Sequence, residues 1–235
     1  MANSSFLVLV PAHNESARIG AVITAALRHL PVLVVDDGST DDTAGVAEGA
    51  GATVIGQSPN QGKGAALRAG FRWALEHEIE AVVTVDGDGQ HDPAEIPGFL
   101  GAYARRTVGG DPTELIVGQR HFSAMPPVRR VANILGTVVL SAALGRWIPD
   151  NQSGYRLIGR RLMNAMLDSR EDGFALEVEM IAVCLRESWP IDWVPIRTIY
   201  ADETSHIEPR GHLREFLDVT RRARRIARAG PLWSR

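Results

Sequence analysis

Length, composition and charge narrow the class of protein before any motif is considered. The chain has 235 residues, of which 45% are hydrophobic and 23% charged, and its formal net charge is −3, which suits one large α/β domain or a domain with an appendage. A single cysteine, Cys184, excludes a disulfide framework and indicates a reducing compartment. The negative charge, without an aromatic and basic platform, disfavours nucleic acid as a partner.

Short apolar runs alternate with longer amphipathic stretches along the first ninety residues. Four runs are predicted as strands: Phe6–Val10, Val32–Val35, Thr53–Ile55 and Ala81–Val85. Three stretches are predicted as helices: Ser16–Leu30 with a cap at Asn14 or Ser16, a helix capped by Ser39 or Asp41 that ends near Gly49, and Ala65–His77. This alternation predicts βαβ units and a mostly parallel sheet, and Gly101–Thr113 is the most loop-like stretch.

Polar residues follow three of the predicted strands. In parallel α/β sheets, ligands bind outside the carboxyl ends of the strands. The loops at those ends are Pro11–Glu15, Asp36–Thr40 and Asp86–Gln90. We therefore expect these three loops to converge on one crevice.

The third of these loops, in the sequence VVTVDGDGQHDP, carries the strongest chemical signal. Asp86 and Asp88 can aim at one hard cation, with the side-chain carbonyl oxygen of Gln90 as a third ligand. Taken alone, a D-x-D at a strand end is often a helix cap or a solvated turn. A calcium loop of the EF-hand kind is excluded, because its sixth and twelfth positions hold His91 and Pro97.

Two common nucleotide motifs are also excluded. No G-x-G-x-x-G follows the first strand, and the residue six before Lys63 is Gln57 where a P-loop has glycine. The remaining interpretation is a nucleotide held by carboxylates and backbone groups, with a cation for its diphosphate. Lys63 precedes a predicted helix and can add positive charge near an anionic ligand, or it can be a surface lysine.

Four motifs resemble, in order and spacing, those of the inverting family 2 glycosyltransferases. They are PAHNE (11–15), VVDDGSTDDT (34–43), NQGKGAALRAG (60–70) and VDGDGQHDP (85–93), and IVGQRH (116–121) and DNQSGYRL (150–157) continue the pattern. The resemblance covers about residues 5–205 and is nearest to the branch of dolichyl-phosphate mannose synthase and bacterial polyprenyl-phosphate glycosyltransferases. It implies a GT-A fold, an α/β architecture with a mostly parallel central sheet and helices on both faces, which binds a nucleotide-sugar with Mg2+ or Mn2+.

The resemblance also implies roles for single residues. Those that would surround the base and ribose of the donor are Pro11, His13, Glu15, Val35 and Asp37. Those that would handle the ribose, the diphosphate and the metal are Asp86, Gly87, Asp88 and Gln90. Arg120 matches an arginine that contacts the donor phosphates or the acceptor, although a surface salt bridge is the plain alternative.

The chain departs from this family branch near residue 200. Tyr200 stands where the branch has an arginine, and Ser205-His206 replaces Ser-Lys. His206 can still donate a hydrogen bond to the donor or carry a charge.

On the acceptor side, the chemistry depends on what the acceptor is. A hydroxyl acceptor needs a general base, for which Asp150 is the candidate, unless it is only a turn or cap residue. A phosphate acceptor is already an anion and needs cationic positioning. The candidate arginines are Arg120, Arg129, Arg130 and Arg156.

Two segments indicate contact with a membrane surface. The longest apolar run, Val131–Leu144, is about 14 residues, below the roughly 18–20 that span a bilayer, and the N-terminus shows no secretory signal. Pro126–Ile148 suits either an interfacial helix or a core helix. The basic tail, residues 211–235 after a GT-A domain over 1–210, suits a helix that binds anionic lipid, a solvated helix or a subunit contact.

The sequence thus predicts a cytoplasmic enzyme that binds peripherally at the inner face of the cytoplasmic membrane. Its expected reaction is metal-dependent, inverting transfer of a hexose, from a donor of the GDP-mannose or UDP-glucose type, to a polyprenyl phosphate. Asp88, Asp150 and Arg120 are the expected catalytic residues. Two alternatives are a soluble or glycan hydroxyl acceptor, and a nucleotide-sugar-binding protein without catalysis. The sequence leaves the oligomeric state open.

Overall fold

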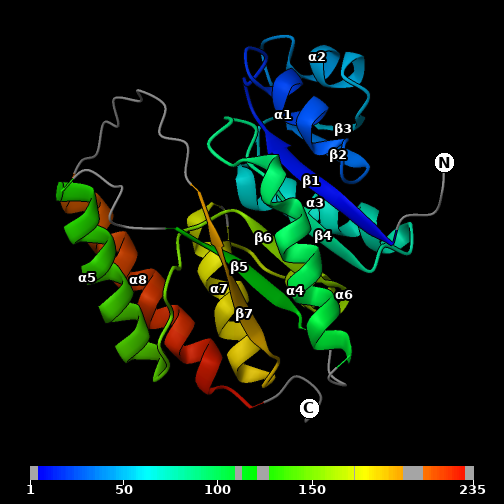
Figure 1. The fold of residues 1–235 in the computed structure, drawn as a ribbon. Coiled ribbons are helices and arrows are strands. Elements are labelled where there is room, and N and C mark those ends of the chain that lie inside the picture. Colours follow the sequence, from blue (N-terminus) through cyan, green and yellow to red (C-terminus); the bar gives the residue numbers. More distant parts are fainter. Residues whose placement is uncertain (1–4, 109–112, 121–126, 172, 198–208, 231–235) are drawn as a thin grey trace.

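The computed structural model describes residues 5–108, 113–120, 127–171, 173–197 and 209–230 (Figure 1). Seven strands are present in these ranges: β1 (Phe6–Ala12), β2 (Val32–Asp37), β3 (Thr53–Gln57), β4 (Ala81–Thr84), β5 (Leu115–Arg120), β6 (Arg156–Gly159) and β7 (Ile191–Ile196). The helices are α1 (Ile19–Ala26), α2 (Thr43–Gly49), α3 (Lys63–Glu76), α4 (Ile96–Val108), α5 (Pro127–Leu144), α6 (Arg160–Met166), α7 (Phe174–Arg186) and α8 (Pro209–Arg228), with a short 3-10 turn at Pro93–Glu95.

All seven strands belong to one sheet, in the order β3-β2-β1-β4-β6-β5-β7. β1 pairs in parallel with β2 and β4, β2 with β3, and β5 with β7. β6 is antiparallel to both of its neighbours, β4 and β5. The prediction of a mostly parallel sheet is therefore confirmed, with β6 as the exception.

Alternate residues of the central strands point to opposite faces of the sheet, and each face is covered by helices. Leu7 and Leu9 of β1 face a core that includes residues of α3, α6 and α7. Val8 and Val10 face the second core, with residues of α1 and α4. Helix α3 lies very close to β1, because a Cβ atom added at Gly70 would lie 2.3 Å from Leu9 Cδ1.

Two details of the sequence prediction are wrong. The first helix begins at Ile19 after an N-cap at Arg18, because the side chain of Asn14 binds the next loop and does not cap the helix. The stretch predicted as a loop from residue 101 is helical as far as Val108. Its residues Ala102 and Tyr103 are buried against the sheet, and this packing outweighs the glycine and polar content.

Helices α5 and α8 lie side by side at one end of the molecule (Figure 1). α8 packs on both α5 and α7 through a small apolar cluster: Leu140, Val178, Ala182, Val219 and Ala223. The apolar face of the basic tail helix is thus covered by its own chain, and its arginines point outward. In the ranges that the structure describes, no helix has the length and apolarity needed to cross a bilayer. The division into domains 1–210 and 211–235 stays a prediction.

Candidate active site

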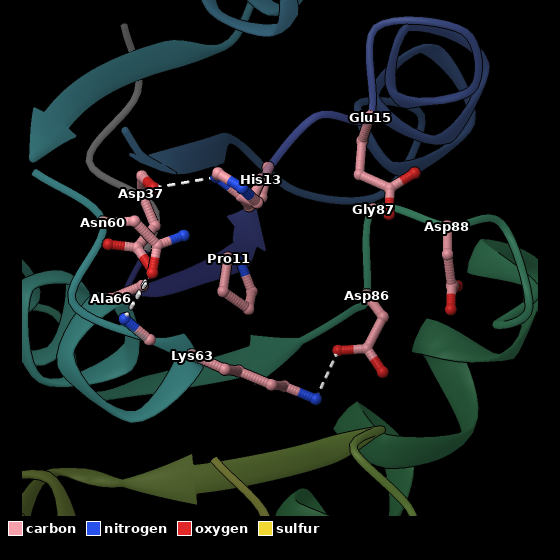
Figure 2. A pocket seen from close by; sticks show the side chains of 12 residues that line it. Pro11, His13, Glu15, Asp37, Asn60, Lys63, Ala66, Asp86, Gly87 and Asp88 are labelled. Atoms are coloured by element: carbon pink, nitrogen blue, oxygen red, sulfur yellow. Dashed lines mark hydrogen bonds and ion pairs between the residues drawn. The ribbon is translucent and has the colours of Figure 1, made fainter. Parts of the chain in front are cut away.

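A cavity of about 310 Å³ opens at the carboxyl ends of β1, β2 and β4 (Figure 2). Its lining comes from all three predicted loops and from the start of α3: Pro11, Ala12, His13, Glu15, Asp37, Asn60, Gly62, Lys63, Ala66, Asp86, Gly87 and Asp88. The parallel register places these loops at one edge of the sheet, as the sequence predicts. Eight of the residues expected to bind the donor therefore share one cavity.

The remaining predicted residues lie outside this lining. Val35 has a fully buried side chain in the core, so its side chain does not reach the cavity. Gln90 lies in the β4 loop beside Asp88, and Arg120 ends β5. His206, with Tyr200, lies outside the described residues.

The loops after β1 and β2 are tied together by Asn14, which adopts a left-handed conformation with φ 57°. Its backbone N–H donates to Ser39 Oγ at 2.9 Å, and its side-chain Oδ1 accepts from the Thr40 N–H at 2.8 Å. His13 Nδ1 lies 3.0 Å from the carbonyl oxygen of Asp37, a distance at which the ring N–H donates. These contacts fix one wall of the cavity before any ligand binds.

Asp37 holds the loop that leads into α3. Its carboxylate oxygens accept hydrogen bonds from the backbone N–H groups of Gln61, at 2.8 Å, and Gly62, at 2.7 Å. Only 3% of Asp37 is exposed. The next residue, Gly38, has φ +68° and lies so close to this loop that an added Cβ would be 2.8 Å from Asn60 N. Asp37 therefore shapes the cavity through the backbone of the opposite loop.

Lys63 extends along the floor of the cavity to Asp86 (Figure 2). Its Nζ lies 2.7 Å from Asp86 Oδ1 and 3.1 Å from Oε1 of Glu177, a buried residue of α7. Burial alone would favour the neutral carboxyl group, but the charge of Lys63, its hydrogen bond and further positive charge nearby together outweigh burial and keep the pKa of Asp86 below its usual range. Burial likewise opposes the charge of Lys63, yet the two carboxylates raise its pKa.

His91 supports the same aspartate from the other side. The backbone N–H of Asp86 donates to His91 Nδ1 at 3.2 Å, which requires that nitrogen to be unprotonated. Burial lowers the pKa of His91, against the opposing charge of Asp86. His91 is thus a neutral acceptor that helps to fix the loop after β4.

Asp86 and Asp88 offer hard oxygen donors on one wall of the cavity, as a divalent cation requires. Gln90 donates to both oxygens of Asp88, from its backbone N–H and its side-chain Nε2, each at 2.9 Å. Over the described part of the chain, no three His, Cys, Asp or Glu side chains cluster so as to hold an ion by themselves. These residues fit a cation that takes its other ligands from a diphosphate and water.

Arg120 and Asp150 form a second charged unit. Arg120 Nε and Nη2 donate to the two carboxylate oxygens at 2.8 and 2.9 Å, and the Gln152 N–H also donates to Asp150 Oδ1. Asp150 has no exposed surface. Arg156 is buried as well and donates to backbone carbonyl groups, so it holds the 150–154 loop and is not directed at an acceptor.

Comparisons with known proteins decide the family. The sequence model described as "Glycosyl transferase family 2" matches residues 7–167. The chain belongs to glycosyltransferase family 2. It is 30% identical over 205 residues to an undecaprenyl-phosphate mannosyltransferase of Micrococcus luteus, covering 81% of this chain and 82% of the relative. It is 26% identical over 227 residues to a UDP-N-acetylglucosamine–dolichyl-phosphate N-acetylglucosaminyltransferase of Methanococcus voltae, covering 86% and 88%.

The fold is shared with a solved glycosyltransferase. Glucosyl-3-phosphoglycerate synthase of Mycobacterium tuberculosis, solved with Mn2+, UDP and phosphoglyceric acid, superposes with a TM-score of 0.72 at 20% identity. The match covers 93% of this chain and 78% of the synthase. It confirms the predicted GT-A fold, and the family confirms that the chain is a glycosyltransferase.

Sequence reasoning missed two residues of the site, Glu177 and Gly154. Glu177 lies in an apolar helical stretch, where a buried charge next to the acidic loop gives no local signal. Gly154 belongs to the DNQSGYRL motif, but only the folded chain shows that an added Cβ would lie 2.8 Å from Asp86 Oδ2. Both come from parts of the chain far from β4.

Replacing Asp37 with asparagine should destabilise the protein. Asparagine keeps one acceptor oxygen but places an NH2 group against a backbone N–H, so one buried donor loses its partner. We expect the free energy of unfolding, measured in urea, to fall by about 1–3 kcal/mol. Glu48→Gln on the exposed surface of α2 is the control and should change it by less than about 0.5 kcal/mol. Equal effects of the two substitutions would contradict this role of Asp37.

Proposed function

We propose that the enzyme transfers a hexose from a nucleoside-diphosphate sugar to a polyprenyl phosphate, with Mg2+ or Mn2+, while bound peripherally at the inner face of the cytoplasmic membrane. The observation that carries the proposal is the cavity in which Asp86 and Asp88 share one wall. The lipid-phosphate acceptors named for the relatives from Micrococcus luteus and Methanococcus voltae support the acceptor class.

The donor lies in the cavity with its base and ribose toward the β1 and β2 loops. Pro11, His13 and Glu15 line that end, and the backbone held by Asp37 closes it. Asp86 and Asp88, with Gln90 behind them, would hold the cation and so fix the diphosphate. The bound cation neutralises the charge that develops on the leaving nucleoside diphosphate.

The acceptor attacks the anomeric carbon from the face opposite the leaving group, so the configuration inverts. A phosphate acceptor is already a nucleophilic anion and needs positioning by a cation. Arg120 supplies that charge, because Asp150 fixes its guanidinium through two hydrogen bonds. Both Asp150 oxygens already accept hydrogen bonds and the residue is fully buried, which favours a positioning role over that of a general base.

Helix α5 presents an apolar surface suited to a bilayer. Its exposed large side chains follow helical spacing on one face: Val131, Ile134, Leu135 and Val138, which are 66%, 42%, 60% and 47% exposed. Arg130, Arg146 and Trp147 are exposed near the ends of the helix. Helix α8, which packs beside α5, carries exposed arginines that would attract anionic lipid: Arg221, Arg222, Arg224, Arg225 and Arg228.

This surface lies close to the acceptor arginine along the chain. β5 ends at Arg120 and α5 begins at Pro127. A polyprenyl chain held in the bilayer under α5 would bring its phosphate toward the carboxyl end of β5, where Arg120 lies. The geometry suits an acceptor with a lipid tail better than a soluble sugar or acid.

Replacing Asp88 with asparagine should abolish transfer without unfolding the protein. The substitution keeps the side-chain shape but removes the negative charge that would bind the cation. We expect transfer of labelled hexose to undecaprenyl phosphate to fall at least roughly 100-fold, with an unchanged circular dichroism spectrum. Asp168→Asn, an exposed carboxylate remote from the cavity, should retain full activity. A wild-type protein that binds donors but transfers no sugar to any acceptor would refute the proposal.

Adding charge to the apolar face of α5 should weaken membrane binding. We expect Val131→Glu with Leu135→Glu to reduce binding to vesicles of anionic phospholipid by more than about tenfold, since each buried apolar side chain contributes about 1.5–3 kcal/mol. Leu27→Glu is the control, because Leu27 is an isolated exposed leucine at the end of α1. Unchanged vesicle binding, together with efficient transfer to water-soluble acceptors, would favour a soluble acceptor.

A further inference from the structure

Lys63 is the only lysine of the chain, and the other 24 of its 25 Lys and Arg residues are arginines. Its ammonium group lies between two carboxylates, of Asp86 in the β4 loop and Glu177 on α7. The side chain of Glu177 is only 6% exposed, and that of Asp86 is 25% exposed. The compact ammonium group of Lys63 thus lies next to Asp86, which lines the proposed donor cavity.

The backbone at Gly154 closes one side of this group of three charges. A Cβ atom added at Gly154 would lie 2.8 Å from Asp86 Oδ2, 2.9 Å from Lys63 Nζ and 3.2 Å from Glu177 Oε1. A planar guanidinium is larger than an ammonium group and has a fixed fork geometry. The close backbone at Gly154 therefore leaves little space on that side for a group larger than an ammonium.

The charges of this group leave one negative charge in excess. Asp86 and Glu177 carry two negative charges and Lys63 one positive charge, so a divalent cation that approaches Asp86 meets an ammonium group 2.7 Å from its ligand oxygen. Like charges at such distances repel each other, and the repulsion persists in weakened form although the side chain of Lys63 is 34% exposed and that of Asp86 25% exposed. The diphosphate of a donor would add the negative charge that offsets this repulsion.

We propose that Lys63 is a resident counter-cation of the donor site, positioned by Glu177, that keeps divalent metal from binding at Asp86 until a nucleoside diphosphate is present. This inference rests on the proposed donor site. Lys63 gives the site a positive charge for the incoming diphosphate, and Glu177 limits how far that charge can move. The metal and the nucleotide consequently bind with strong positive coupling.

The two residues have opposite effects on the charge of the site. Without the Lys63 charge, the site becomes more negative, so metal alone binds more tightly and nucleotide alone more weakly. Without the Glu177 charge, the site becomes more positive, so metal alone binds more weakly and nucleotide alone more tightly. A merely structural role would weaken binding of both ligands in both variants.

The test measures Mn2+ binding without nucleotide, by electron paramagnetic resonance, and UDP and GDP binding without metal, by calorimetry. Lys63→Met should tighten Mn2+ binding roughly tenfold, as expected for the loss of one charge a few ångströms away, and should weaken binding of the preferred nucleotide. Glu177→Gln should weaken Mn2+ binding and tighten binding of that nucleotide. Lys63→Gln is a second neutral variant in case the methionine variant does not fold. Glu179→Gln is the control, because Glu179 lies on the same helix but accepts from Ser169 Oγ.

A measurement on the wild-type protein needs no variant. Since Lys63 is the only lysine, lysine-specific isotope labelling gives one side-chain NMR signal, which Mg2+ alone should leave in place and Mg2+ with a nucleoside diphosphate should shift. Shifts in the same direction for both variants, or an equal response of the wild-type signal to Mg2+ alone, would overturn the inference. The Mn2+ arm contains no donor, so it tests Lys63 separately, whereas failure of every nucleotide to bind would count against the proposed function.

Discussion

Carboxylates gather at one edge of the mostly parallel sheet, and their neutralisation by fixed donors determines how the loops of the site are arranged. β1, β2 and β4 end side by side, so the acidic residues that follow them are brought together. Each carboxylate has its own donors: Asp37 has two backbone N–H groups and Asp86 has Lys63. Because burial makes an unpaired charge costly, these pairs hold the loops in place and define the cavity.

The same constraint links the donor and acceptor sides. Asp150 is completely buried and is balanced by Arg120. This ion pair fixes the guanidinium group of Arg120 at the end of β5. Beyond β5 the chain enters α5, whose apolar outer face has no partner in the described part of the chain. Its inner face packs on α8. One run of sequence thus connects a fixed arginine with an exposed apolar surface, and the lipid-phosphate acceptor that we propose would use both.

The sequence predicts what depends on local patterns. The β4 strand and the loop with Asp86 follow from an apolar run that ends in alternating aspartate and glycine, and the convergence of loops follows from parallel topology. It does not predict Glu177 or Gly154, because their roles come from contacts made only in the folded chain. Residues 101–108 show the same limit, since burial against the sheet determines that they are helical.

We propose that the crevice at the ends of β1, β2 and β4 binds a nucleoside-diphosphate sugar together with a divalent cation. The most direct test is the melting temperature in the presence of UDP-, GDP- and dTDP-sugars, each with and without Mn2+. A ligand that binds only the native state stabilises it, so one nucleotide should raise the melting temperature by several degrees with Mn2+ and by less without it. No rise with any donor, with or without the cation, would contradict the account.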